Sequence, residues 1–113
     1  MKRRIIAFGR YYNEFIESLN EKEKLKVKYI LSLLGTSDRL PIKFIKQIKK
    51  DLYELRIEYN GNIYRVFFIF DNDKIVVLFN GFQKKSQKTP QNEIEKAIKI
   101  KEEYYEYKRR HDH

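Results

Sequence analysis

Two arginines are placed for chemistry by a turn that lies between them. Arg56 and Arg65 stand on either side of Asn60-Gly61, the strongest short signal for a two-residue β-hairpin turn. A two-residue turn at this point places Arg56 directly opposite Arg65. Like charges that face each other across a sheet destabilise it by up to about 1 kcal/mol. The pair therefore predicts a site for an anion.

A second, weaker turn signal, Asn72-Asp73, separates the next two strands. A two-residue turn here places Asn80 opposite Arg65 and Lys84 further along the same face, whereas a three-residue turn would move Asn80 and Lys84 to the core side. The first register predicts a solvated face with the two arginines. Replacing either arginine is then expected to leave stability unchanged. The opposite face is predicted to be apolar and covered by helices, with Tyr53, Leu55, Ile57, Tyr59, Tyr64, Val66, Phe68, Phe70, Ile75, Val77 and Phe79.

The alternative for the arginine pair is a solvated surface network without chemistry. Glu54 and Glu58 flank Arg56 on the same predicted face and would neutralise the charge. We favour the functional interpretation for the cluster as a unit.

The composition agrees with an anionic partner. The chain has 113 residues, 25 Lys and Arg against 16 Asp and Glu, a net charge of +9, and no cysteine. Such a balance indicates nucleic acid as the partner, and the lack of cysteine excludes disulfides and thiolate chemistry. The sequence has neither the long apolar run of a membrane span nor the apolar core of a signal peptide. We expect one cytoplasmic domain over residues 1–113, without membrane association.

The predicted elements follow from hydrophobic periodicity and turn residues. Asn20 and Glu23 indicate a helix start, and Thr89-Pro90 indicates an N-cap followed by the first helical residue. Two antiparallel helices joined by a tight turn are expected near the N-terminus. The elements are a strand at 4–8, helices at 11–19 and 20–34, a basic segment with a short helical turn at 41–50, strands at 52–59, 63–70 and 75–82, a helix at 90–108, and a flexible tail at 109–113.

A series of short motifs resembles a known family. The motifs are Leu52-Tyr53-Glu54-Leu55-Arg56, Tyr64-Arg65-Val66, Asn80-Gly81-Phe82-Gln83-Lys84-Lys85, Gln87-Lys88-Thr89-Pro90 and Glu93-Ile94. In this order and spacing they resemble the HigB-type toxins of the RelE/ParE superfamily, in the phage-derived subgroup. The resemblance implies an α+β, two-layer RelE-like domain with a small twisted, mainly antiparallel sheet, two N-terminal helices and one C-terminal helix. It also implies a type II toxin, a ribosome-dependent mRNA endoribonuclease, whose partners are the ribosome, mRNA and a HigA-like helix-turn-helix antitoxin.

The resemblance carries over to individual residues. The functional basic positions of the family fall on Arg56, Arg65, Lys84, Lys85 and Lys88. The subgroup usually has a histidine before Gly-Phe, where this chain has Asn80. An asparagine positions a phosphate or a base edge but does not transfer a proton near neutral pH.

Cleavage of RNA without a metal needs a base, an acid and cations that stabilise the phosphorane. Arginines supply only the cations, whereas a lysine among like charges has a lowered pKa and can transfer a proton. We therefore predict Arg56, Arg65, Lys84 and Lys88 as catalytic residues, with Lys84 first for proton transfer and then Lys88 or Lys85. The predicted RNA-binding residues are Asn80, Lys85, Lys49 and Lys50. No metal or cofactor is expected.

Other functions and other proton carriers stay open. ParE-like relatives poison gyrase, and a basic module could bind nucleic acid without catalysis. His111 and His113 are the chain's two histidines, and they fall in the predicted tail. The segment 84–88 is alternatively a solvated charged loop.

Overall fold

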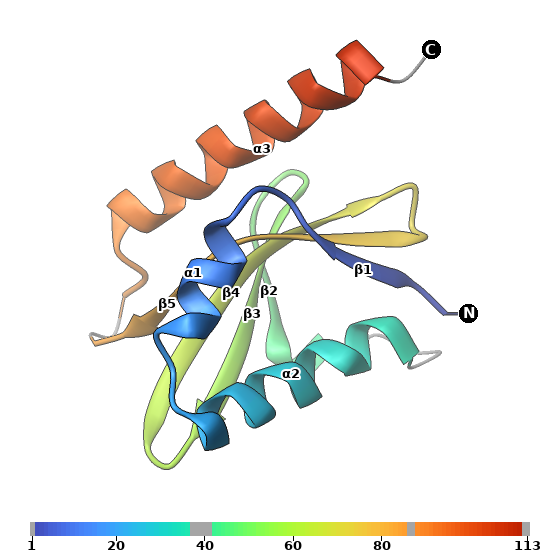
Figure 1. Ribbon diagram of the computed structural model, residues 1–113. Helices are drawn as coiled ribbons and strands as arrows, with labels where there is room; N and C mark the ends of the chain where they lie inside the picture. The colour runs from blue at the N-terminus through green and yellow to red at the C-terminus, as the bar shows by residue number, and fades with distance from the viewer. Residues whose placement is uncertain (1, 37–41, 86–87, 112–113) are drawn as a thin grey trace.

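The computed structural model describes residues 2–36, 42–85 and 88–111, which form an α+β fold (Figure 1). Its elements are β1 (Arg4–Ala7), α1 (Tyr11–Glu17), α2 (Glu21–Thr36), a 3₁₀ turn η1 (Ile42–Phe44), β2 (Ile45–Lys49), β3 (Leu52–Tyr59), β4 (Asn62–Asp71), β5 (Ile75–Lys84) and α3 (Gln91–His111). The sheet has the order β1-β5-β4-β3-β2. β1 pairs parallel to β5, and the other pairs are antiparallel. The predicted fold class and strand meander are confirmed.

Helices cover both faces of this sheet, where a single covered face was predicted. Figure 1 shows α2 and α3 on opposite sides of the sheet. The core beneath α1 and α2 includes Leu55, Ile57, Tyr64, Val66, Phe68, Val76 and Leu78. The core between α3 and the sheet includes Leu52, Phe67, Ile69, Val77, Phe79 and Phe82 of the sheet and Ala97, Ile100 and Tyr104 of α3, with Ile75 packed against it. The prediction for Ile75, Val77 and Phe79 was therefore wrong, because these residues face α3.

The turn between β3 and β4 follows the prediction. Asn60 and Gly61 have φ angles of 52° and 81°. Tyr59 pairs with Asn62, and this register sets Arg56 directly opposite Arg65.

The turn between β4 and β5 is longer than predicted. Asp71 pairs with Ile75, so three residues form the turn, and the pairing then shifts again at a bulge between Val66 and Phe68. Arg65 consequently lies opposite Phe82 instead of Asn80. The two shifts together restore the face, so that Lys84 lies on the same side of the sheet as Arg65.

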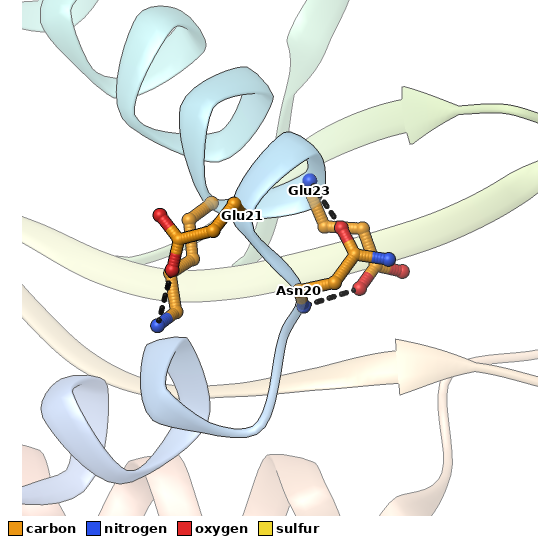
Figure 2. Close-up of polar contacts among 4 residues, drawn as sticks. Asn20, Glu21 and Glu23 are labelled. Atoms are coloured by element: carbon orange, nitrogen blue, oxygen red, sulfur yellow. Dashed lines mark hydrogen bonds and ion pairs between the residues drawn. The ribbon is translucent and has the colours of Figure 1, made fainter.

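The N-terminus of α2 is fixed by a capping box, as the sequence predicts. The Asn20 amide nitrogen donates to Glu23 Oε1 at 2.8 Å, and the Glu23 amide nitrogen donates to Asn20 Oδ1 at 2.9 Å (Figure 2). The Tyr64 hydroxyl of β4 donates to the other oxygen of Glu23. One glutamate therefore caps α2 and links it to the sheet.

The Tyr64 contact predicts a loss of stability at alkaline pH. Burial and the hydrogen bond to Glu23 raise the pKa of Tyr64 to about 12, from 10.0. Because the folded state holds the phenol proton more tightly than the unfolded state, this contribution is complete below pH about 10 and is lost as pH rises towards 12. The test is urea unfolding between pH about 9 and 12, a range that includes the ordinary tyrosine pKa of about 10. Over this range the free energy of unfolding should decline less for Tyr64→Phe than for the wild type. Equal declines would contradict this assignment.

The first two helices do not form the expected antiparallel pair. α1 packs mainly on β5, and α2 packs on β3 and β1. The segment 41–50 also differs from its prediction, because only Ile42–Phe44 form a helical turn and Ile45–Lys49 form strand β2. Pro41 lies outside the described residues.

The last helix begins later and ends later than predicted. The Pro90 carbonyl accepts the first helical hydrogen bond, from the Ile94 amide at 3.3 Å, so Thr89 is not the N-cap. α3 continues to His111 and includes residues 109–111 of the predicted tail, while 112–113 lie outside the described part. The Tyr104 hydroxyl and the Lys108 ammonium both donate to Asp71, which joins the far end of α3 to the β4–β5 turn. Within the described chain, no helix is long and apolar enough to cross a membrane.

Gly81 is required by the packing of α1 on the sheet. A Cβ atom at this position would lie 2.5 Å from Phe15 Cδ2. We expect Gly81→Ala to lower the free energy of unfolding by about 1–3 kcal/mol, because the ring and the backbone must move apart. Urea denaturation measures this change, and the added Phe15→Leu substitution should recover part of it. A wild-type midpoint for Gly81→Ala alone would contradict the prediction.

Candidate active site

The centre of the candidate site is a buried ion pair between β3 and β4. Arg65 Nη1 lies 3.3 Å from Glu54 Oε1, and their side chains are 8% and 0% exposed. The Thr89 hydroxyl, just before α3, donates to Glu54 Oε2 at 2.9 Å. The prediction that Arg65 lies on a solvated face was wrong, because Arg65 is buried in a pair with Glu54, and Thr89 contacts this pair from the segment before α3.

The pair is only partly satisfied by hydrogen bonds. Among the described residues, Glu54 Oε1 and Arg65 Nε have no hydrogen-bond partner. Burial lowers the pKa of Arg65, and the Glu54 carboxylate opposes this shift. A guanidinium stays protonated in proteins, so Arg65 remains a fixed positive charge under the surface.

Arg56 is the accessible arginine of the facing pair. Its Nη2 lies 3.0 Å from Glu58 Oε1, and the two side chains are 44% and 65% exposed. Exposed pairs of this kind contribute only about 0–1 kcal/mol, so a phosphate can displace the carboxylate. Each arginine thus has one carboxylate neighbour, as in the surface-network alternative, but the Glu54 pair is buried.

Lys84, the last residue of β5, is half-buried beside these charges. Partial burial lowers the pKa of Lys84, and the charge of Arg65 lowers it further, while Glu54 opposes the shift. Lys46 and Arg56 add smaller effects in the lowering direction. A lowered pKa makes a lysine better suited to proton transfer.

Lys46 belongs to this group although the sequence analysis did not select it. It is exposed on β2 and pairs with Glu54 of β3. Recognising 45–49 as a strand would have brought Lys46 into register with Glu54. We call Lys46, Arg56, Arg65 and Lys84, with Glu54 among them, the basic cluster.

The other lysines near the predicted site fall into two groups. Lys85 and Lys88 are exposed and flank residues outside the described part. Lys88 precedes Thr89, whose hydroxyl contacts Glu54. Lys49 and Lys50 lie at the β2–β3 turn, and Lys49 pairs with Leu52, four residues from Arg56 along β3, or about 13 Å. The structure therefore does not bring Lys49 and Lys50 into the basic cluster.

Asn80 is buried rather than exposed to RNA. Its side chain lies beneath the first turn of α3, and the residue is 1% exposed. Asn80 Nδ2 donates to the Glu93 carbonyl oxygen at 3.3 Å and to Glu93 Oε1 at 3.1 Å. The prediction of an RNA contact is replaced by a structural role, the attachment of α3 to β5.

His111 lies far from the basic cluster. It is exposed in the last turn of α3, with its ring stacked on Tyr107 at a centroid distance of 4.3 Å. At 1.5 Å per residue, it lies about 30 Å along the helix from the start of α3. His113 is outside the described residues. His111 therefore does not supply the proton carrier of the cluster.

Comparison with known proteins agrees with this architecture. Residues 14–102 match the family described as "Phage derived protein Gp49-like (DUF891)". A similar solved structure is the archaeal RelE in the RelE–RelB complex from Pyrococcus horikoshii OT3, with a TM-score of 0.53 and 18% identity over 74% of this chain and 96% of that chain. No curated protein matches the sequence. The family match covers most of the chain, including the basic cluster, and the chain therefore belongs to the phage-derived Gp49-like family.

Proposed function

We propose that this protein is the toxin of a type II toxin–antitoxin system, of the HigB type. It acts in the cytoplasm as a ribosome-dependent, metal-independent mRNA endoribonuclease that inhibits translation. The observation that carries this proposal is the placement of Arg56 opposite Arg65 with Lys84 on the same face. The RelE-like fold and the Gp49-like family support it.

Three residues of the basic cluster and two neighbouring lysines have chemical roles in this proposal. Arg56 contacts the scissile phosphate and stabilises the charge of the phosphorane. Arg65 contributes a fixed positive charge from below the surface, which attracts the phosphate without contacting it. The 2′-oxygen attacks the phosphorus and the bond to the 5′-oxygen breaks, while Lys84 takes the 2′-hydroxyl proton and returns it to the leaving 5′-oxygen. Lys85 and Lys88 hold the RNA backbone.

The proposed partners are mRNA on the ribosome and an antitoxin. The similar RelE was crystallised with RelB, which supports an antitoxin partner for this chain. A HigA-like helix-turn-helix protein is our proposal for its identity. The net charge of +9 favours an antitoxin that contributes acidic surface.

The deciding experiment is inducible expression in bacteria followed by mapping of RNA 5′ ends. We expect growth arrest and new ends inside translated codons, with poor cleavage of purified RNA, because the ribosome aligns the substrate. Cleavage in a translating extract should not change when Mn²⁺ or Zn²⁺ is added. Gyrase inhibition without RNA cuts would indicate a ParE-like toxin, and salt-dependent RNA binding without cuts would indicate a non-catalytic module.

A further inference from the structure

A groove of about 470 Å³ opens next to the basic cluster. Its walls come from α2 (Lys26 and Ile30), η1 (Lys43 and Phe44) and β3 (Arg56 to Glu58). Arg56 belongs both to this groove and to the basic cluster. Arg56 is thus the residue through which the groove adjoins the cluster.

The groove exists because strand β2 is shorter than β3. β2 begins at Ile45, which pairs with Leu55. Residues 56–59 of β3 extend past this point, and the η1 turn lies there instead of a paired strand. The sheet edge therefore leaves space between η1 and α2.

The groove is lined by positively charged side chains and by aromatic and apolar side chains. Three cations, Lys26, Lys43 and Arg56, face one carboxylate, Glu58. Lys43 Nζ lies 5.0 Å from the centre of the Phe44 ring. Ile57, 1% exposed, forms part of the same lining. A phosphate and a base require this combination of cations and an aromatic surface.

We propose that this groove binds one nucleotide of single-stranded RNA next to the phosphate held by Arg56. The phosphate of that nucleotide contacts Lys26 and Lys43, and its base packs on Phe44. This inference rests on the proposed function and names a binding site for its substrate. An acidic protein segment would use the lysines but has no base to place on the ring.

The charge contribution can be tested with an RNA that cannot be cleaved. The probe is a fluorescent, single-stranded 2′-O-methyl octaribonucleotide of mixed sequence, and its binding is measured by anisotropy at several salt concentrations. Lys26→Gln/Lys43→Gln should weaken binding about tenfold and reduce the salt slope by about 0.7, which corresponds to the one phosphate that both lysines contact on single-stranded RNA. The matched control, Lys22→Gln/Lys28→Gln, removes two α2 lysines outside the groove and should change affinity less than twofold. Equal losses for both double variants, or no loss, would overturn the inference.

The aromatic contribution needs a separate comparison. Phe44→Leu keeps an apolar side chain at a position that packs on the core. It should weaken binding of the octamer about fivefold or more, and leave binding of an abasic octamer unchanged. An equal loss on both probes would overturn the base contact. Displacement of the probe by an octaglutamate peptide at similar concentrations would identify an acidic segment as the occupant instead.

The binding assay is independent of the proposed chemistry, because a methylated 2′-hydroxyl cannot attack the phosphate. If groove variants bind the probe as well as the wild type while mRNA is still cut, only the groove assignment is overturned. If the probe binds as expected and no mRNA is cut in cells, the endoribonuclease proposal fails and the groove remains an RNA site.

Discussion

Arg65→Ala is expected to lower the free energy of unfolding by about 3–5 kcal/mol, because it leaves the Glu54 carboxylate buried without its charged partner. Glu54 is 0% exposed, and its other contact is the Thr89 hydroxyl. A neutral hydroxyl cannot replace the lost guanidinium charge. Urea denaturation at neutral pH measures the change. A wild-type midpoint for Arg65→Ala would contradict the buried pair.

Two further variants separate charge from packing in this prediction. Arg56→Ala, on the facing strand but exposed, should change the free energy of unfolding by no more than about 0.5 kcal/mol. Glu54→Met/Arg65→Met removes both charges and should recover most of the stability lost in Arg65→Ala, because apolar replacement of a buried pair is often neutral. The same double variant should be inactive as a nuclease.

Loss of activity without loss of stability is the second large effect that we expect. Arg56→Ala should reduce mRNA cleavage about a hundredfold or more, the range observed when one electrostatic donor to a transition state is removed. Lys84→Ala should cause a similar loss through proton transfer. Cleavage in a translating extract, normalised to folded protein, measures both.

The matched control is the neighbouring core residue Leu55, which is 0% exposed. Leu55→Ala should cost about 2–5 kcal/mol by opening a cavity. It should reduce toxicity only by reducing the amount of folded protein. Full activity per folded molecule in Arg56→Ala, or a specific defect in Leu55→Ala, would contradict the assignment of the site.

Local signals in the sequence predict the parts of the fold that depend on a few neighbouring residues. Asn60-Gly61 fixes its turn because both residues tolerate positive φ, and the register of Arg56 against Arg65 follows directly. The capping box at Asn20 is equally local. These features need no knowledge of the tertiary structure.

The predictions that were wrong concern features that depend on contacts between elements distant in the sequence. Ile42, Ile45 and Ile48 recur every three residues and suggest a helix, but Ile45 and Ile48 lie in a strand and pack on opposite faces of a sheet that is covered on both sides. The unbroken apolar run from Ile75 to Phe79 was the available signal for two covered faces. The bulge in the β4–β5 pairing has no such local signal.

The candidate site was likewise predicted from the sequence only in part. The sequence places Arg56, Arg65 and Lys84 on one face, and the register supports this grouping. The sequence does not show that the pair of Glu54 and Arg65 is buried, because the contact of Thr89 with Glu54 joins residues that are 35 positions apart. Only the tertiary structure shows that Arg56 is exposed and Arg65 is buried. The difference in role between the two arginines follows from this difference in exposure.

The parallel pairing of β1 with β5 has a consequence for synthesis of the chain. Residues 4–7 are made first, but their partners are residues 75–78. During translation, which proceeds from the N-terminus, the first strand stays unpaired until about two thirds of the chain has been added. The nascent chain can form its α2 and β3–β4 contacts earlier, but the sheet is completed only when β5, which ends at Lys84, has emerged. The basic cluster, which includes Lys84 at the end of β5, therefore assembles late in synthesis, after the partners of the first strand have been made.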